Sequence, residues 1–441
     1  MARRRGESKQ IANPRRELRP RSAGAAGSVR QGVSGLPARI PTDAGIRSSY
    51  PSRCESRTWS RPRTCAASHT AGLTGRSRRE RSAKRLRDAG TILLGKLNTH
   101  EYAYGVTTNN PHFGPTRNPW NLAHIPGGSS GGSGAAIAAG LATATTGTDT
   151  GGSIRMPASV CGVVGLKPTY GRVSKAGVLP LSYLFDHTGP ITRTVEDAAL
   201  VLNAIAGYDP TDATTVRTPV DDYTAELGAG LRGLRIGIPR AYFFAHLEDD
   251  VATAVEQAIA ELRRLGADVR EVAVPGVEAG IGALFGLVLA EAQEIHARAL
   301  RTRPADFGAD VLDLLSGETP DAESLMRALR ARDALCVSMR SALESVDLLV
   351  TPTTPITAAG IGQETVRYGG LEESLLGAMI RCTAPFNATG LPALSLPCGF
   401  TRSGLPVGLQ LAGRPFDEVT VLRAGHAYEQ ATEWHERVPA L

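Results

Sequence analysis

The 441-residue chain is 42% hydrophobic and 5% aromatic, and it carries a formal net charge of +6. It is long enough to bury a large core, and we see neither an apolar run that could cross a bilayer nor a signal peptide near Met1. The six cysteines lack Cys-x-x-Cys spacing and the nine histidines lack metal-ligand spacing. We therefore expect free thiols in a cytoplasmic protein, with no disulfide framework and no metal site.

The positive charge is confined to the first fifth of the chain. Residues 1–82 hold 18 arginines, one lysine and five acidic residues, a net charge of +14, whereas residues 83–441 carry −8. The first segment is rich in Arg, Ser, Pro and Gly and has no helical or strand periodicity, so we expect it to be disordered or frame-shifted. A shifted reading frame in GC-rich DNA is our leading interpretation. A native disordered tail, an organelle transit peptide and a nucleic-acid-binding arm are the alternatives.

Ordered structure is expected to begin at residue 83. The pattern predicts a short helix over residues 83–89 and a short buried strand over 91–95, followed by a loop-rich stretch to residue 126. Residues 134–141 read as a buried, alanine-rich helix entered from a glycine turn. Thr194 is predicted to cap a helix that runs to Ala206.

In the second half, predicted strands and helices alternate. We expect strands over 234–239, 267–273 and 346–350, and helices over about 249–265, 277–300, 322–344 and 418–432. Two β runs, 393–399 and 406–412, are joined by Arg402-Ser-Gly404 as a hairpin. The alternation indicates an α/β fold, and the hairpin makes its sheet mixed.

Two serines in glycine-rich loops are candidate catalytic residues. Ser129 lies in Gly-Gly-Ser-Ser-Gly-Gly, and Ser153 follows Thr150, Gly151 and Gly152. A serine hydroxyl needs a neighbouring base to become a nucleophile, and the tetrahedral intermediate needs donors for its oxyanion. The two glycines allow successive backbone N–H groups to converge on one oxygen. If the intervening helix folds back, the Ser129 hydroxyl can lie beside Ser153 and relay its proton.

Other interpretations of these loops are weaker. Residues 127–131 fit the Gly-x-Ser-x-Gly elbow of α/β-hydrolases, but that elbow needs a preceding strand, and residues 121–126 form a poor one. The glycines are not followed by Lys-Ser/Thr, so they do not form a P-loop. Ser153 could also be no more than a helix cap.

The sequence around both serines resembles the amidase signature family. The match is carried by Gly-Gly-Ser-Ser-Gly-Gly-Ser from Gly127, Gly-Thr-Asp-Thr-Gly-Gly-Ser-Ile-Arg from Gly147, and Cys-Gly-Val-Val-Gly-Leu-Lys-Pro-Thr-Tyr-Gly-Arg from Cys161. The resemblance implies a single α/β domain over 83–441, incomplete at its N-terminal end, with a mixed central sheet covered by helices. It implies an enzyme that cleaves a linear carboxylic amide to acid and ammonia through an acyl-serine, with no cofactor.

The resemblance also implies a role for each residue of the serine loops. Ser153 would be the acylated nucleophile, and Ser129 the bridging serine, preceded by a cis peptide bond. The backbone amides of Thr150, Gly151, Gly152 and Ser153 would form the oxyanion hole. Supporting roles would fall to Asp149, Arg155 and Ser130, although Asp149 and Arg155 could be exposed loop charges that form no more than a local pair.

The third member of the family's Ser–cis-Ser–Lys triad is not found. The lysine belongs to an upstream Gly-Ile-Pro-x-x-x-Lys-Asp type segment, which would fall near residues 54–60, and that stretch contains no lysine. The lysines before Ser129 are Lys9, Lys84 and Lys96, and the last two match family positions with other roles. Arginine stays protonated and cannot serve as the base. We therefore predict an inactive or severely impaired amidase.

Two alternative functions remain open. One is the A subunit of a glutamyl-tRNA(Gln)/aspartyl-tRNA(Asn) amidotransferase, which would release ammonia from glutamine for partner B and C subunits; Met156 weakly disfavours it. The other is a catalytically dead binding protein. We expect a small-molecule amide as the partner, leave a homodimer open, and expect neither membrane nor nucleic-acid binding.

Four residues could line the acyl pocket, but each is more readily explained as core: Tyr102, Phe113, Leu184 and Phe386.

Overall fold

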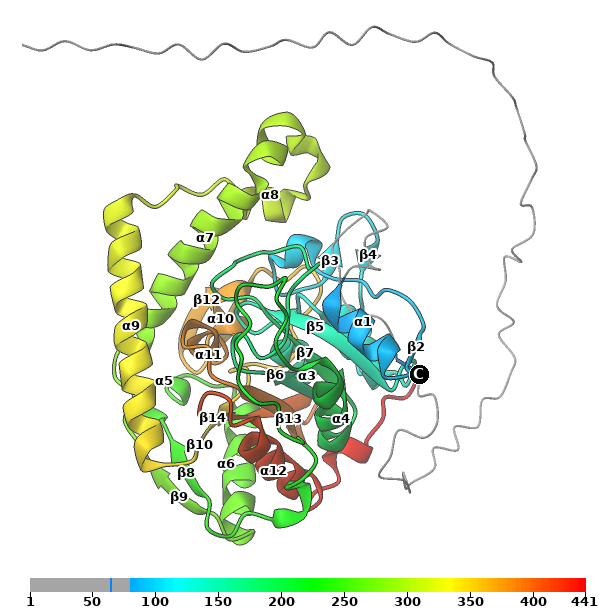
Figure 1. Ribbon diagram of the computed structural model, residues 1–441, viewed down its shortest axis with the longest axis vertical. Coiled ribbons are helices and arrows are strands. Elements are labelled where there is room, and N and C mark those ends of the chain that lie inside the picture. The colour runs from blue at the N-terminus through cyan, green and yellow to red at the C-terminus, as the bar shows by residue number, and fades with distance from the viewer. Residues whose placement is uncertain (1–63, 66–79) are drawn as a thin grey trace, which may run out of the picture. The chain divides into compact units, whose positions relative to one another are not determined.

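The computed structural model describes residues 64–65 and 80–441, and its centre is a mixed eight-stranded sheet (Figure 1). In spatial order the strands are β5 (Ala144–Asp149), β7 (His187–Thr192), β6 (Val164–Lys167), β13 (Ala393–Phe400), β14 (Pro406–Gly413), β10 (Leu348–Pro352), β8 (Arg235–Ile238) and β9 (Asp268–Glu271). Neighbours from β5 to β10 are antiparallel, and β10, β8 and β9 are parallel. The predicted mixed α/β fold is confirmed.

Helices cover both faces of this sheet (Figure 1). They are α1 (Arg81–Asp88), α2 (Gly131–Ala138), α3 (Arg155–Cys161), α4 (Val195–Ile205), α5 (Arg240–Phe243), α6 (Asp249–Arg264), α7 (Val277–Thr302), α8 (Ala309–Leu315), α9 (Ala322–Ser345), α10 (Leu375–Ile380), α11 (Ala384–Ala388) and α12 (Glu418–Glu429). Successive residues of β10 alternate between the two cores: Leu349 packs with α2, α3, α7 and α9, and Leu348 and Val350 pack with α4, α6 and α12. This is the period-two alternation of a sheet that is buried on both faces.

The predicted long helices and the C-terminal hairpin are confirmed. The helices expected over 249–265, 277–300, 322–344 and 418–432 are α6, α7, α9 and α12, and the hairpin is formed by β13 and β14. The Thr194 hydroxyl accepts a hydrogen bond from the Asp197 N–H at 3.1 Å, so the predicted cap of α4 is present. The cysteines at 161, 336, 382 and 398 are free thiols, as predicted.

Strands β5, β6 and β7 were not predicted. Every residue of β5 and β7 is buried, although these strands are rich in Thr and Gly. A strand covered on both faces shows no polar–apolar alternation, and some of the buried polar groups here form hydrogen bonds within the sheet. For example, the Thr145 hydroxyl donates to the Ile191 carbonyl at 3.1 Å. The small sheet of β11 (Thr365–Tyr368) and β12 (Leu371–Ser374) was also missed, as were the shorter helices α3, α5, α8, α10 and α11.

The strand predicted over 91–95 is shorter than expected and is not buried. It is β2 (Ile92–Leu93), in which Ile92 is 48% exposed and Leu93 37% exposed. It pairs in parallel with β1 (Thr64–Cys65) rather than with the central sheet, so no core covers its side chains. A further two-stranded sheet, β3 (Asn109–Asn110) with β4 (Gly114–Pro115), lies in the loop-rich stretch that follows.

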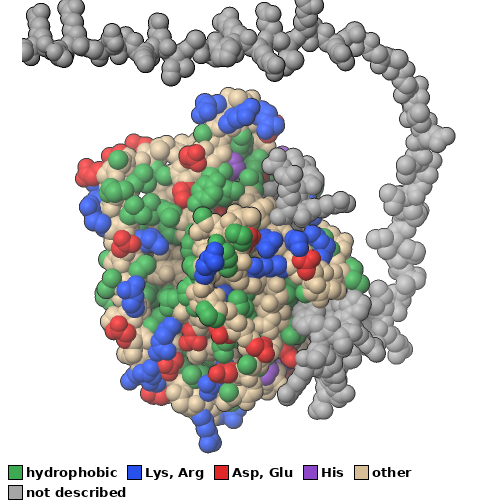
Figure 2. Space-filling view, viewed as in Figure 1, with side chains coloured by type: hydrophobic (Ala, Val, Ile, Leu, Met, Phe, Trp, Pro, Cys, Tyr) green, Lys and Arg blue, Asp and Glu red, His purple; other side chains and the backbone are tan. Residues whose placement is uncertain are grey.

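The predictions for the N-terminal segment concern residues 1–82, of which residues 1–63 and 66–79 lie outside the described residues, whereas residues 64–65 form β1 and residues 81–82 begin α1. The division of the chain at residue 82 therefore stays a prediction. None of the described helices combines the length and the apolar character that a bilayer span requires. Figure 2 shows acidic and basic side chains interspersed over the lower part of the visible face, in keeping with the modest net charge of residues 83–441.

A buried carboxyl group joins α12 to the start of α4. Glu429 is 3% exposed, and its Oε1 accepts a hydrogen bond from the Val195 N–H at 2.9 Å. Its Oε2 has no hydrogen-bond partner among the described residues. Burial disfavours the charged form and raises the pKa of Glu429 to about 8.

We expect the Glu429→Gln variant to lose part of the pH dependence of stability. The folded state keeps the Glu429 proton up to about pH 8, whereas the unfolded chain releases it near a pKa of about 4.3. The contribution of Glu429 to the free energy of unfolding is therefore complete below about pH 4.3. It falls by ~1.4 kcal/mol per pH unit as the pH rises to about 8. Urea unfolding at pH 6 and pH 8 measures this slope. Glu433→Gln, at an exposed carboxyl, is the control, and an unchanged slope in Glu429→Gln would contradict the prediction.

Candidate active site

The two predicted serine loops lie together beside the end of β5. Ser129 and Ser130 precede α2, and Ser153 lies between β5 and α3. The peptide bond between Gly128 and Ser129 is cis. The Ser130 N–H donates to the Ser153 carbonyl at 3.2 Å, and the Ser130 hydroxyl donates to the Thr148 carbonyl at 3.3 Å. The fold therefore brings together two loops that are 24 residues apart in the sequence.

The Ser129 side chain is fully buried, and the hydrogen bonds at this residue are made by its backbone. Its carbonyl accepts hydrogen bonds from the His100 N–H at 2.9 Å and the Thr108 hydroxyl at 3.3 Å, which fix the backbone. Its hydroxyl makes no hydrogen bond to any described residue. Lys84 and Lys96 therefore do not reach it; Lys84 pairs with Asp88 at the exposed surface of α1, and Lys96 is exposed.

The alternative interpretations of these serines find no support in the local structure. Residues 121–128, which the structure describes, form no strand before Ser129, as an α/β-hydrolase elbow would require. Ser153 does not cap α3: the capping acceptor is Asp149, whose Oδ2 accepts from the Ile154 N–H at 3.1 Å and the Arg155 N–H at 3.4 Å. The Ser153 side chain is thus buried without a structural role in starting the helix.

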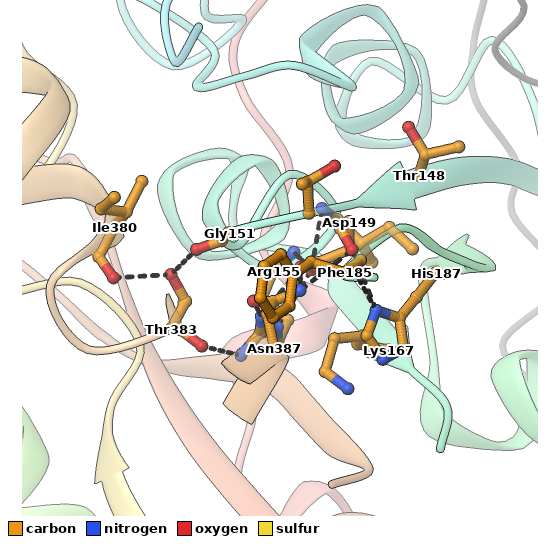
Figure 3. A network of polar contacts seen from close by, with 12 residues as sticks. Thr148, Asp149, Gly151, Arg155, Lys167, Phe185, His187, Ile380, Thr383 and Asn387 are labelled. Carbon is orange, nitrogen blue, oxygen red and sulfur yellow. Dashed lines mark hydrogen bonds and ion pairs between the residues drawn. The ribbon is translucent and has the colours of Figure 1, made fainter. Parts of the chain in front are cut away.

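The loop from Thr150 to Ser153 is held from both sides while its amides stay free. The Thr150 hydroxyl donates to Asp186 Oδ1 at 2.6 Å. The Gly151 carbonyl accepts from the Thr383 hydroxyl at 2.6 Å (Figure 3). The backbone N–H groups of Gly151, Gly152 and Ser153 make no hydrogen bond to another described residue. Such a run of unpaired N–H groups can bind an oxyanion.

Glycine is required at position 152. Its φ is +139°, and a Cβ built there would lie 2.2 Å from Thr383 Oγ1 and 3.1 Å from Met156 Cγ. Any side chain would therefore push the loop away from Thr383.

Asp149 and Arg155 form a buried ion pair beneath this loop (Figure 3). Both side chains are 0% exposed, so the expectation of exposed loop charges is wrong. The reason is that β5 and α3 are both interior elements, and the pair faces α11 and β14 rather than solvent. Burial alone would raise the pKa of Asp149, but the charge of Arg155 and its hydrogen bonds outweigh this and hold the pKa well below its usual value.

All five N–H donors of Arg155 are used. Nε and one Nη2 hydrogen bind Asp149 at 3.0 and 2.8 Å. The other Nη2 hydrogen binds Asn387 Oδ1 at 2.5 Å, and Nη1 donates to the Thr383 carbonyl at 2.9 Å and to Gln410 Oε1 at 2.8 Å. Asn387 Nδ2 in turn donates to the Asp149 carbonyl at 2.9 Å and to its Oδ1 at 2.8 Å. This network anchors the start of the Thr150–Ser153 loop to distant parts of the chain.

Two further titratable groups near Asp149 were not singled out from the sequence. His187 pairs with Asp149 across β5 and β7, and its Nδ1 donates to the carbonyls of Asp149 at 3.1 Å and Phe185 at 2.6 Å. Lys167 is fully buried, and its Nζ donates to the carbonyls of Leu391 at 2.5 Å and Pro168 at 3.2 Å. Burial lowers the pKa of both His187 and Lys167 well below the usual values. Lys167 lies in the Cys161–Arg172 run that carries the family resemblance, but no pattern in the sequence indicated that its side chain is buried.

The four candidate acyl-pocket residues are not brought together. Phe386 stacks on Phe243 in the core, and Tyr102 packs against His296 and Phe307. Phe113 and Leu184 are 70% and 38% exposed. A cavity of about 350 Å³ is lined in part by Asp186, which binds Thr150, but none of Ser129 or Thr150 to Ser153 lines it. In residues 80–441, no group of three or more His, Cys, Asp or Glu side chains is arranged to hold a metal ion.

A family comparison agrees with this geometry. The Amidase family model matches residues 63–422. The chain belongs to the amidase family. It is 47% identical over 383 residues to the A subunit of the glutamyl-tRNA(Gln) amidotransferase of Moorella thermoacetica, covering 81% of this chain and 77% of that protein. It is also 47% identical over 361 residues to an amidase of Pseudomonas putida, covering 81% and 76%.

Solved structures of amidase-family enzymes share the fold. The peptide amidase of Stenotrophomonas maltophilia superposes with a TM-score of 0.72 at 34% identity, covering 86% of this chain and 84% of that one. As a member of this family, the chain is an enzyme of the class that acts on linear amide C–N bonds.

Proposed function

We propose that this chain is an amide hydrolase that forms an acyl-ester on Ser153, with Ser129 relaying the proton, and that its activity is severely impaired. The observation that carries the proposal is the run of N–H groups at Gly151, Gly152 and Ser153 that no described residue pairs, next to a buried serine and a second serine loop. Thr150 fixes the loop through Asp186, and the Asp149–Arg155 pair fixes it from below.

The proposed reaction has two steps. Ser153 Oγ attacks the amide carbonyl carbon while its proton passes to Ser129, and the loop amides stabilise the oxyanion. The C–N bond breaks as the nitrogen takes up this proton from Ser129, ammonia leaves with the bonding electron pair, and an acyl-ester remains on Ser153. Water then attacks the ester carbonyl, releases the carboxylic acid and restores the Ser153 hydroxyl. Supporting groups are Asp149, Arg155 and Ser130, and no step requires a metal or an organic cofactor.

We infer the impairment from the lack of a proton acceptor beside the Ser129 hydroxyl in the part of the chain that the structure describes. A relay must hand its proton to a base, and in the family that base is the triad lysine. The Ser129 hydroxyl has no hydrogen-bond partner among the described residues, and arginine cannot take the role. Without a base, Ser129 can accept the Ser153 proton only by becoming charged in a buried site, which is unfavourable.

A second candidate function is that of an amidotransferase A subunit, which would act with B and C subunits. It is favoured by relatives such as the Moorella thermoacetica protein. Met156 weighs against it, because this 1%-exposed apolar side chain lies directly against Gly152. Co-purification with a B-type subunit would support the second function. A dead binding protein, a homodimer and a cytoplasmic location remain predictions.

Acylation by an activated ester tests the proposed nucleophile without requiring an efficient base. We expect p-nitrophenyl butyrate to add one butyryl group to the full-length chain, detected by intact-protein mass spectrometry and mapped to Ser153 by peptide analysis. Ser153→Ala should remove the adduct completely. Ser133→Ala is the matched control, because Ser133 is an equally buried serine whose hydroxyl only binds the Thr146 carbonyl. A butyryl group on another residue, or one that survives in Ser153→Ala, would refute the assignment.

A further inference from the structure

We propose that this site accepts an uncharged, apolar acyl group, and that Ile380 selects it. The inference rests on the proposed function, because it places the acyl group beside the Gly151–Ser153 loop. It concerns the substrate class, which neither the family assignment nor the relatives' names determine.

Ile380 is the side chain that faces Gly151. A Cβ built on Gly151 would lie 3.8 Å from Ile380 Cγ2, and apart from the adjoining Thr150 and Gly152 only Ile380, among the described residues, has atoms within 4 Å of that position. Thr383 keeps the two segments together: its hydroxyl lies 2.6 Å from the Gly151 carbonyl and 3.2 Å from the Ile380 carbonyl (Figure 3). Gly151 is partly exposed, whereas Ile380 is 5% exposed. An aliphatic side chain in a fixed position therefore lies within van der Waals reach of a side-chain atom placed at Gly151.

Met156 provides a second apolar contact to the same loop. Its Cγ would lie 3.1 Å from a Cβ on Gly152, and its N–H donates to the Gly152 carbonyl at 2.7 Å. Ile380 and Met156 thus contact the two glycines that precede the nucleophile, one from each neighbouring helix.

Most of the hydrogen-bonding capacity of Asp149, Arg155 and Asp186, the described charged groups that hold the loop, is already used. Arg155 uses all five of its donors, and Asp149 accepts from Arg155, Asn387 and the N-terminal amides of α3. Asp186 accepts from the Thr150 hydroxyl on Oδ1 and from the N–H groups of Leu181 and Ser182 on Oδ2. A carboxylate or ammonium on the acyl group would lose its hydration here and gain few partners in return, which is costly.

Arg381 is the nearest cation in the sequence to Ile380, and its guanidinium is engaged elsewhere. Its centre lies 4.5 Å from the ring centroid of Tyr242, whose hydroxyl donates to the Arg381 carbonyl at 3.3 Å. Because Nε of Arg381 has no hydrogen-bond partner among the described residues, a rearrangement of this side chain is the route by which a carboxylate could still be bound. The experiment must therefore include Arg381.

Three amides separate the possibilities. Pentanamide is glutamine with its carboxylate replaced by a methyl group and its ammonium by hydrogen, and glutaramate restores only the carboxylate. We would titrate each into the full-length Ser153→Ala chain by isothermal calorimetry, so that turnover does not interfere. We expect pentanamide to bind about tenfold or more tightly than glutaramate or glutamine. Ile380→Ala should weaken pentanamide binding by about tenfold, whereas Leu376→Ala, a half-buried leucine on the same helix, should leave it unchanged.

Each outcome decides the proposal. Tighter binding of glutaramate or glutamine would overturn it while leaving the amidase function intact, and loss of that binding in Arg381→Gln would identify the group responsible. Pentanamide binding that does not change in Ile380→Ala would also overturn it. If none of the three amides binds the full-length chain, the proposed function fails together with the inference.

Discussion

Restoring the missing base is expected to raise amide hydrolysis by about 10⁴-fold or more, because members of a catalytic triad act as a unit. The variant is a chimera in which residues 1–79 are replaced by the N-terminal segment of an active amidase-family member, with its Gly-Ile-Pro-x-x-x-Lys-Asp type motif. No described residue forms a hydrogen bond with the Ser129 hydroxyl. The lysine of the chimera would provide this hydroxyl with both a hydrogen-bond partner and a base. The measurement is kcat/KM for pentanamide, by ammonia release, in the original chain and in the chimera.

A single substitution provides the control for this chimera. The same chimera with the triad lysine replaced by arginine keeps the charge and the added core but cannot accept a proton, so it should stay as slow as the original chain. If the arginine chimera is equally fast, the gain comes from completing the fold and the base hypothesis is wrong. If the original chain already matches the lysine chimera, the proposed impairment is wrong.

The origin of residues 1–82 can be checked at the level of the DNA. We would sequence the region upstream of the Ser82 codon and translate all three frames. A Gly-Ile-Pro-x-x-x-Lys-Asp type stretch in another frame would mean that the natural enzyme is a complete amidase. If no frame encodes it, the lysine is lost and the hydrolase assignment describes the ancestry of the chain.

Replacing Arg155 by methionine is expected to destabilise the fold by about 3–5 kcal/mol, the usual cost of leaving one partner of a buried ion pair uncompensated. Asp149 would remain 0% exposed with its charge unpaired, and the Thr383 carbonyl, Asn387 and Gln410 would each lose a donor. Urea unfolding of the full-length chain measures the change. Arg367→Met, which breaks the exposed pair with Glu372, is the control and should cost less than about 1 kcal/mol.

The double variant Asp149→Asn, Arg155→Met tests the cause. If the unpaired charge is responsible, removing it should recover part of the lost stability. The pH dependence gives a second measure: the pKa of Asp149 is depressed in the folded state, so its contribution is complete above the unfolded pKa of about 3.9 and is lost as the pH falls below it. The original chain should show this acid-induced loss and the double variant should not. No recovery in the double variant would mean that packing, not charge, holds this part of the fold.

The sequence by itself determined the elements whose signals are local. Helix α6 shows its apolar periodicity within one window, and Thr194 caps α4 by accepting from an N–H three residues later. The hairpin of β13 and β14 is set by the turn at residues 402–404. The two serine loops were also found from the sequence, because glycines that free the backbone amides adjoin Ser153 directly.

The tertiary structure alone decided what surrounds those serines. Arg155 meets the Thr383 carbonyl and Asn387 from more than 200 residues away, and no local pattern shows such a contact. The burial of Asp149 depends on β5, a Thr- and Gly-rich strand whose burial becomes evident only when β7 pairs with it and α2 packs against it. The contact of Ile380 with Gly151 likewise exists only because Thr383 holds two distant segments together. Propensity and periodicity act over a few residues, whereas the environment of a buried charge or an acyl pocket is set by which distant segments the sheet brings into contact.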